Sequence, residues 1–266
     1  FADYSIDRDR VFLDGASMGG NGSFQFACQY PDLFAGAAPR SGGPRFRQLP
    51  TGPGKNDRAV MAEGLVNLEA TPLYWIVGDA DPKVPIDWVR TARAQMEALK
   101  LEFVYREIPG GGHEWFPREN AAALDWMAAR RRNAYPLRAG IETDERRFNR
   151  AFWLEISEFR GKESVRREFQ DLDRKRIEER LVFQDDAKAQ GERAEGSNEI
   201  RVSATGVREV TIYLHERMVD FGKQVGIAVN GSRSTHRVKP SLETLLESAR
   251  RDRGLLYTAA VKVRVK

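Results

Sequence analysis

The chain is poor in the residues that build disulfides and metal centres. It has one cysteine, Cys28, and three histidines among its 266 residues. A single cysteine excludes a disulfide within the chain, and the sequence has no Cys/His cluster at metal-ligand spacing, so no metal site is predicted. Cys28 lies in the stretch FQFACQY, where a buried thiol is favoured over a nucleophile. No organic cofactor is predicted, and neither the cytosol nor export is excluded.

Long apolar runs and a one-signed charge pattern are also missing. No apolar run reaches about 18 residues, so no membrane-spanning helix is predicted. The 43 Lys and Arg residues are mixed with 39 Asp and Glu residues, which argues against a dedicated phosphate-binding surface. The basic run Arg130–Arg132 could indicate nucleic acid, but it closes an expected helix, where cations complement the last carbonyls. We therefore expect neither nucleic acid nor a membrane as a partner.

Short apolar runs alternate with helical patterns in the first half, which indicates a parallel α/β sheet. We expect strands at 11–13, 34–39, 73–77 and 102–108 and helices at 23–30, 86–100 and 117–132. The last of these helices is expected to turn Ala121, Leu124 and Ala128 inward. Residues 42–70 are rich in Gly, Pro and charge, so a long loop is predicted there.

The second half has a different character. Residues 136–145, with Pro136 and Gly140, are interpreted as a linker between an α/β domain at 1–135 and a second domain at 146–266. Residues 162–196 could form a hairpin with a long tip or be partly helical. Short alternating strands, a turn signal at Asn230-Gly231 and a brief helix near 241–251 then indicate a small all-β, sandwich-like domain.

The pentapeptide Gly15-Ala16-Ser17-Met18-Gly19 fits the pattern G-x-S-x-G. A nucleophilic serine must project from a sharp turn between a strand and a helix, and glycines at the flanking positions avoid collisions there. The apolar run VFL before the motif and the helical pattern after it supply that context. The N–H of Met18 would lie at a helix N-terminus, where it can donate to an oxyanion.

A serine nucleophile needs a base and an acid that orients the base. His113 follows the glycines of PGGGHEW after an expected strand, whereas His215 and His236 lie within strand patterns. His113 is therefore the predicted base. Asp79 and Asp81 both follow the expected strand LYWIV and both could be the acid.

From Asp3 to Arg132 the sequence resembles the α/β-hydrolases. The resemblance is carried by GASMG, by FACQYPDLFAGAAPRSGG and by GDADPKVP. Esterases of the polyhydroxybutyrate-depolymerase or feruloyl-esterase type and prolyl-oligopeptidase-like hydrolases are the most similar members. The acid of this family commonly stands in G-x-x-D-x-x-V-P, which implies Asp81 as the acid and leaves Asp79 as a turn or capping residue.

The resemblance implies a serine hydrolase that cleaves a small-molecule or polysaccharide-linked ester through a Ser17–His113–Asp81 triad. A prolyl-oligopeptidase-like peptidase remains an alternative, and so does an inert scaffold whose β-sandwich binds a polysaccharide or a partner. In the family the serine turn follows the fifth of eight strands. The chain is therefore expected to hold the C-terminal half of the sheet and to need a preceding half, with a second oxyanion donor.

Overall fold

The computed structural model describes residues 4–50, 58–171, 176–251 and 254–266, and the chain divides into two compact units. The first unit comprises Phe1–Pro136 and Ala249–Leu255, and the second comprises Leu137–Ser248 and Leu256–Lys266. The first division falls after Pro136, and the predicted end of the α/β domain is residue 135. The return of Ala249–Leu255 to the first unit has no counterpart in the sequence-based division.

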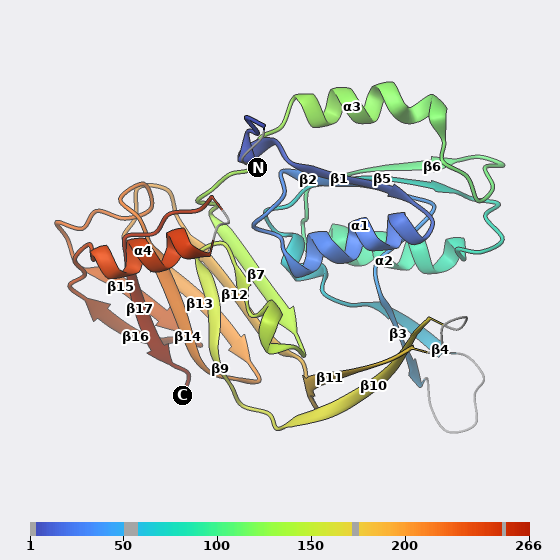
Figure 1. The fold of residues 1–266 in the computed structure, drawn as a ribbon. Coiled ribbons are helices and arrows are strands. Elements are labelled where there is room, and N and C mark those ends of the chain that lie inside the picture. Colours follow the sequence, from blue (N-terminus) through green and yellow to red (C-terminus); the bar gives the residue numbers. More distant parts are fainter. Residues whose placement is uncertain (1–3, 51–57, 172–175, 252–253) are drawn as a thin grey trace. The chain divides into compact units, whose positions relative to one another are not determined.

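A four-stranded parallel sheet lies at the centre of the first unit, in the order β1-β2-β5-β6 (Figure 1). Its strands are β1 (Phe12–Ala16), β2 (Gly36–Arg40), β5 (Leu73–Gly78) and β6 (Phe103–Ile108). Every residue of β2 and β5 is buried. Strands that are covered on both faces have continuous rather than alternating apolar runs, and this pattern correctly predicted a parallel α/β sheet.

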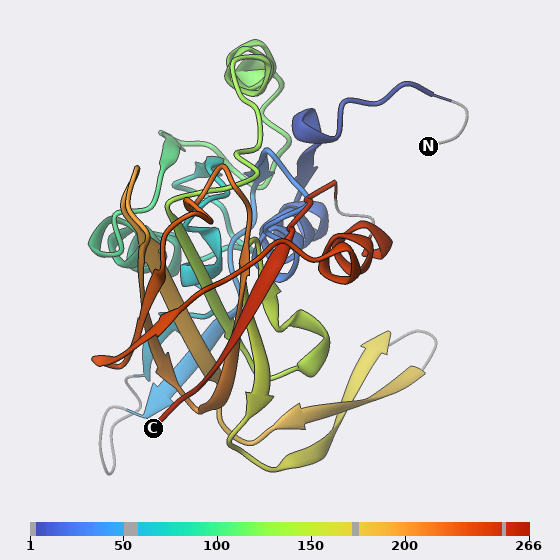
Figure 2. The same cartoon turned by 90° about the vertical axis from the view of Figure 1, so that its left-hand side faces the viewer.

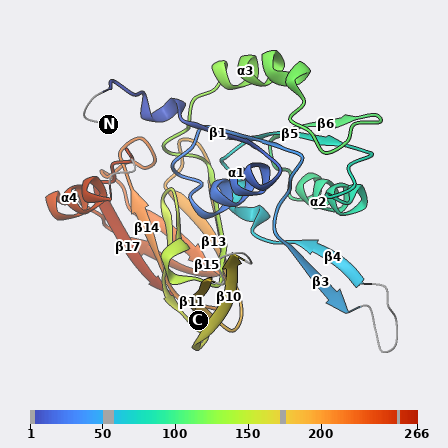
Figure 3. The same cartoon turned by 45° about the vertical axis from the view of Figure 1, so that its right-hand side comes forward.

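Helices cover both faces of this sheet (Figure 3). The three α-helices are α1 (Met18–Gln29), α2 (Ile86–Ala98) and α3 (Asn120–Ala128), and the 3-10 helices are η1 (Arg8–Arg10), η2 (Leu65–Leu68) and η3 (Pro117–Glu119). On the α1–α2 face, Trp75 of β5 packs edge-on against Phe24 of α1. On the α3 face, Tyr74 of β5 packs against Trp126. Successive β5 side chains therefore serve opposite cores, as strand geometry requires.

The inward face of α3 differs from the prediction. Ala121, Leu124 and Ala128 are exposed, and Leu124 keeps 61% of its surface accessible. The buried residues are Ala123 and Trp126. The large indole of Trp126 determines which face is buried, because it packs against the rings of Phe12 and Tyr74 and removes more apolar area from water than a leucine can.

The predicted loop at 42–70 contains regular structure instead. β3 (Phe46–Pro50) and β4 (Arg58–Ala62) form an antiparallel hairpin, and η2 follows it. Phe46 packs edge-on against Trp88 of α2, and the Ala62 N–H donates to Gln95 of α2 at 2.9 Å. These contacts with α2 support a pair of strands that the Gly, Pro and charge content obscured in the sequence. Residues 51–57 lie outside the described part.

Two β-sheets form most of the second unit, in the orders β16-β15-β13-β12-β7 and β17-β14-β9-β8. Their strands are β7 (Arg138–Thr143), β8 (Arg150–Ala151), β9 (Leu154–Phe159), β12 (Ala187–Arg193), β13 (Glu199–Thr205), β14 (Val207–Leu214), β15 (Val225–Val229), β16 (Ser232–His236) and β17 (Ala259–Arg264). The helices of this part of the chain are η4 (Arg146–Phe148) and α4 (Leu242–Arg250). The buried indole of Trp153 packs over Gly191 of β12.

The predicted linker at 136–145 is wrong, because β7 occupies Arg138–Thr143 and pairs with β12. Ala139 and Ile141 are each 1% exposed, so this segment contributes to the core of the second unit. Pro136 and Gly140 suggested a linker, but Gly140 lies in the ladder opposite Gln190. The short alternation of small and apolar residues was the signal for a strand.

The charged segment at 162–196 adopts the hairpin alternative. β10 (Glu163–Asp171) pairs antiparallel with β11 (Arg176–Phe183), and β12 follows. Figure 2 shows these two strands as a ribbon that extends away from the two sheets of the second unit. The turn signal at Asn230-Gly231 is also confirmed: both residues have positive φ, of 49° and 81°, and β15 pairs antiparallel with β16. Positive φ at both central residues is the requirement of a type I′ turn.

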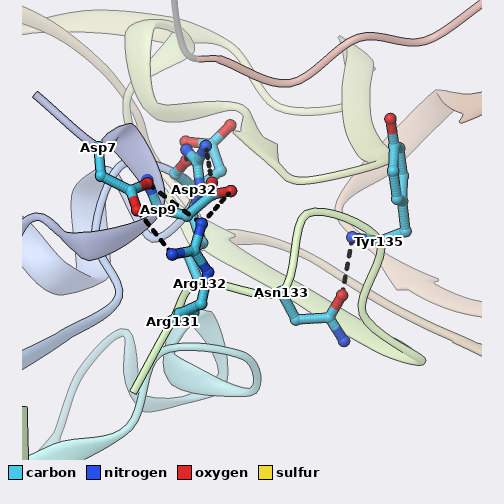
Figure 4. A network of polar contacts seen from close by, with 7 residues as sticks. All are labelled: Asp7, Asp9, Asp32, Arg131, Arg132, Asn133 and Tyr135. Carbon is cyan, nitrogen blue, oxygen red and sulfur yellow. Dashed lines mark hydrogen bonds and ion pairs between the residues drawn. The ribbon is translucent and has the colours of Figure 1, made fainter. Parts of the chain in front are cut away.

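The basic run Arg130–Arg132 is engaged within the first unit. Arg130 donates to the Trp126 carbonyl at 3.1 Å, near the end of α3. Arg131 pairs with Asp7, and Arg132 pairs with Asp9 (Figure 4). These contacts support the structural interpretation of the run.

Candidate active site

Ser17 stands at the turn between β1 and α1. Its φ of 57° is unusual for a residue other than glycine. The Ser17 N–H donates to the Arg40 carbonyl at 2.9 Å, and the Ser17 carbonyl accepts from the Asn21 N–H at 2.9 Å. The backbone is thereby fixed to the neighbouring strand and to the first turn of α1. Met18 is the first residue of α1, so its N–H belongs to the turn whose donors lack intrahelical acceptors.

The glycines of the motif serve different purposes. A Cβ on Gly15 would lie 2.5 Å from the Gly19 carbonyl oxygen, so the close approach of β1 and α1 requires glycine at 15. A Cβ on Gly19 would meet no atom within 4 Å in the described part of the chain. The expectation that both flanking glycines avoid collisions therefore holds for Gly15 only. Gly20, which the motif does not include, is also required, because a Cβ there would lie 2.3 Å from the Arg40 carbonyl oxygen.

Asp81 lies between β5 and α2, and its side chain is 1% exposed. One carboxylate oxygen accepts from the N–H groups of Lys83 and Val84 at 2.8 and 3.0 Å. Burial alone would raise the pKa of Asp81. The hydrogen bond from His113 and the two backbone hydrogen bonds outweigh burial and hold the pKa below its ordinary value of 3.8. Asp81 is therefore a carboxylate at neutral pH.

Asp79 has a different position. Its Oδ1 accepts from the Gly110 N–H at 2.6 Å, and the N–H of Ala80 donates to the Gly111 carbonyl at 3.0 Å. A Cβ on Gly78 would lie 2.1 Å from that Gly111 oxygen. Asp79 and Gly78 thus join the end of β5 to the loop that carries His113. The prediction of a turn or capping residue did not include this contact with the loop after β6.

His113 follows β6 and connects the other two side chains. Its Nε2 lies 2.6 Å from the Ser17 Oγ, and its Nδ1 lies 2.8 Å from the Asp81 Oδ2. An ionised Asp81 accepts from Nδ1–H, which leaves Nε2 to accept the serine proton in the neutral imidazole. All three predicted residues are brought together at the carboxyl ends of parallel strands. His215 and His236 lie at the end of β14 and in β16, in the second unit.

The motif search missed two residues that contact the loop of His113. Arg40, at the end of β2, donates from Nη1 to the Trp115 carbonyl and to the Asn120 side chain. Ser41 donates to the Glu114 carbonyl at 2.7 Å and accepts from the Glu114 N–H at 3.2 Å. A charged residue at the end of an otherwise small, apolar strand was the available sequence signal for Arg40.

Neither a cluster of metal-ligating side chains nor a membrane-spanning helix is found in the part of the chain that the structure describes. No cluster of three or more His, Cys, Asp or Glu side chains there is arranged to hold a metal ion. None of the described helices has the length and apolar character needed to cross a membrane. Cys28 is buried on α1.

Similarity to known proteins is found in both sequence and structure. No family model matches the chain. A solved thermostable esterase is 24% identical, with a TM-score of 0.40 over 49% of this chain and 33% of that one. A ferulic acid esterase is 18% identical, with a TM-score of 0.33 over 46% of this chain and 52% of that one.

Two curated relatives match part of the chain. The "Putative esterase NocK" of Nocardia uniformis subsp. tsuyamanensis is 36% identical over 97 residues, 36% of this chain. The Poly(3-hydroxyalkanoate) depolymerase C of Paucimonas lemoignei is 51% identical over 43 residues, 16% of this chain. The matches span 24% and 10% of the length of these two relatives. Together with the serine turn and the parallel sheet already described, these matches support an α/β-hydrolase of the serine esterase kind.

Proposed function

We propose that the protein hydrolyses carboxylic esters by acyl transfer, with Ser17 as nucleophile, His113 as base and Asp81 as the residue that orients the base. One observation carries the proposal. A continuous hydrogen-bonded path runs from Ser17 Oγ to His113 Nε2 at 2.6 Å and from His113 Nδ1 to Asp81 Oδ2 at 2.8 Å. These distances fall within the range that proton transfer between a nucleophile and its base requires.

The chemistry follows from these positions. As the Ser17 oxygen attacks the ester carbonyl, its proton passes to His113 Nε2, and the imidazolium is stabilised by the Asp81 carboxylate. The carbonyl oxygen becomes an oxyanion, and the N–H of Met18 is the proposed donor to it. His113 then gives the proton to the leaving alcohol, and an acyl group remains on Ser17. Water next attacks this acyl group and passes a proton to His113, which returns the proton to the Ser17 oxygen as the acid is released. Two features oppose reorganisation during these steps: the fixed Ser17 backbone and the buried Asp81.

Ester substrates are favoured over peptides because both curated relatives are named for ester chemistry. The depolymerase name points to esters of hydroxy acids as one substrate class to test. A nitrophenyl ester and a prolyl-peptide reporter, assayed side by side, separate the esterase from the peptidase alternative, and faster cleavage of the peptide would reject the ester assignment.

The first prediction concerns Ser17→Ala in the full-length protein. The substitution removes the only oxygen that the proposal allows to attack, so labelling by a fluorophosphonate probe should disappear and nitrophenyl ester hydrolysis should fall by about 10⁶-fold. The thermal unfolding temperature, measured alongside, controls for misfolding. Labelling of a folded Ser17→Ala protein at the wild-type rate would exclude Ser17 as the nucleophile.

A further inference from the structure

Arg40 is a buried arginine that contacts both the serine turn and the segment that follows His113. Its side chain is 2% exposed, and its Nε and Nη2 donate to the two oxygens of Asp14 at 2.9 and 3.1 Å. Its backbone carbonyl accepts the N–H of Ser17 at 2.9 Å. Asp14 lies on β1, three residues before the serine, so one residue joins the ends of β1 and β2 through both its main chain and its side chain.

The third nitrogen of the same guanidinium contacts the loop that follows His113. Nη1 donates to the Asn120 Oδ1 at 2.7 Å and approaches the carbonyl oxygens of Trp115 and Phe116 at 3.3 and 3.4 Å. The guanidinium carbon also lies 4.7 Å from the centre of the Trp115 ring. Phe116 has a φ of 56°, an unfavourable conformation for a bulky residue. This conformation therefore needs outside support, and the contacts of Arg40 provide it.

The geometry of these contacts depends on the shape of the arginine head. A guanidinium is planar and presents several N–H groups in fixed directions, so it can hold a carboxylate on one side and carbonyl oxygens on another. A lysine ammonium keeps the charge but is a point donor on a flexible stem. The contacts of Arg40 require a guanidinium, because three different nitrogens donate, two to Asp14 and one to Asn120.

We propose that Arg40, oriented by Asp14, is a positioning residue that sets the distance between Ser17 Oγ and His113 Nε2. The proposal rests on the proposed function of these two residues. Arg40 contacts both sides of the site. Its carbonyl holds the serine turn, and its side chain holds Trp115 and Phe116 of the histidine loop and Asn120 at the start of α3. Loss of the guanidinium hydrogen bonds should displace His113 from Ser17 without removing either residue.

The test is Arg40→Lys in the full-length protein, assayed for kcat and KM on a nitrophenyl ester. Since a displacement of about 1 Å can cost roughly 100-fold in rate, we expect kcat to fall by about 100-fold while KM changes less than about threefold. The rate of fluorophosphonate labelling should fall with kcat.

Arg132→Lys is the matched control. The Arg132 side chain is 1% exposed, pairs with Asp9 at 2.7 Å and donates to the Asp32 carbonyl at 2.5 Å, so its burial and partners resemble those of Arg40 (Figure 4). None of these partners belongs to the candidate triad. If Arg132 is purely structural, Arg132→Lys should lower the thermal unfolding temperature and leave kcat per folded molecule unchanged.

The outcomes separate the two proposals. If Arg40→Lys is folded and has the kcat of the wild type, or if both variants lose kcat equally, the positioning proposal is wrong while the Ser17 result still stands. If Arg40→Lys does not fold, Asp14→Asn replaces it, with an expected kcat loss of roughly tenfold because the Asn120 contact of Arg40 remains. A wild-type kcat in Asp14→Asn would then reject the proposal. Failure of the proposed function itself appears separately, as a Ser17→Ala protein that is still labelled.

Discussion

At the scale of single residues, three of the six described non-glycine residues with positive φ lie around the candidate site. Ser17, Ser41 and Phe116 have φ values of 57°, 41° and 56°. Such conformations cost free energy and persist where neighbouring contacts hold them. Ser17 is held by the Arg40 carbonyl, Ser41 by the Glu114 backbone and Phe116 by the Arg40 side chain. These strained residues present the serine and position the loop of the histidine.

Asp81→Asn tests the role of the buried carboxylate. An amide can stabilise the wrong imidazole tautomer, so kcat should fall by about 10⁴-fold with little change in KM. Because the pKa of Asp81 is held below 3.8 in the folded protein, its ionised form stabilises the fold at neutral pH. This contribution is present above the unfolded pKa and is lost as the pH falls through the folded pKa.

Unfolding temperatures of the wild type and Asp81→Asn, measured between pH 7 and pH 2, check the same assignment. The stability advantage of the wild type should shrink on acidification below about pH 4. Asp79→Asn is the matched control, because Asp79 accepts from the Gly110 backbone and not from His113. An equal kcat loss in both variants would contradict the assignment of Asp81 as the orienting acid.

At the scale of elements, α3 offers a test of which residues support the sheet. Trp126 is 8% exposed and contacts the rings of Phe12 and Tyr74, whereas Leu124 is 61% exposed on the same helix. Trp126→Ala should lower the free energy of unfolding by about 3–5 kcal/mol. Leu124→Ala should change it by less than about 0.5 kcal/mol. Denaturant unfolding measures both, and a larger effect at Leu124 would contradict the observed orientation of α3.

The elements also show what the sequence could and could not predict. The parallel sheet, Ser17 and His113 were predictable, because each depends on a local pattern: a continuous apolar run, G-x-S-x-G, and a histidine after the glycines that follow a strand. Asp79 and Asp81 share one local pattern, and the family resemblance was needed to favour Asp81. The buried face of α3 was not predictable, since two faces of that helix have similar apolar content. Which face is buried depends on what Trp126 contacts. β7 and the β3–β4 hairpin were missed because glycine, proline and charge suggested irregular structure. Pairing with β12 supports β7, and contacts with α2 support the hairpin. Arg40 was missed because the partners of its side chain lie 26 to 80 positions away.

At the scale of the whole molecule, the division into two units predicts that stability and catalysis can be changed separately. A Cβ on Gly191 would lie 2.4 Å from the Trp153 ring in the second unit. Gly191→Ala should therefore destabilise that unit by about 1–3 kcal/mol through overpacking. At 25 °C, kcat on a nitrophenyl ester should be unchanged, because the proposed catalytic residues belong to the first unit.

Calorimetry measures the change in stability. Gly161→Ala is the control within the same unit, since a Cβ there would make ordinary contacts of 3.7 and 3.8 Å with Phe183. We expect Gly191→Ala to lower the unfolding temperature of one transition, and Gly161→Ala to leave it nearly unchanged. A loss of kcat in folded Gly191→Ala protein would show that the second unit takes part in catalysis.

The central claim is that Ser17 forms an acyl-enzyme with the help of His113. The most direct test stops nitrophenyl ester turnover with acid and determines by mass spectrometry where the acyl group is bound. The account predicts an adduct of the mass of the acyl group on the peptide that contains Ser17, and none in Ser17→Ala. An adduct on another residue, or sustained turnover by the folded Ser17→Ala protein, would contradict it.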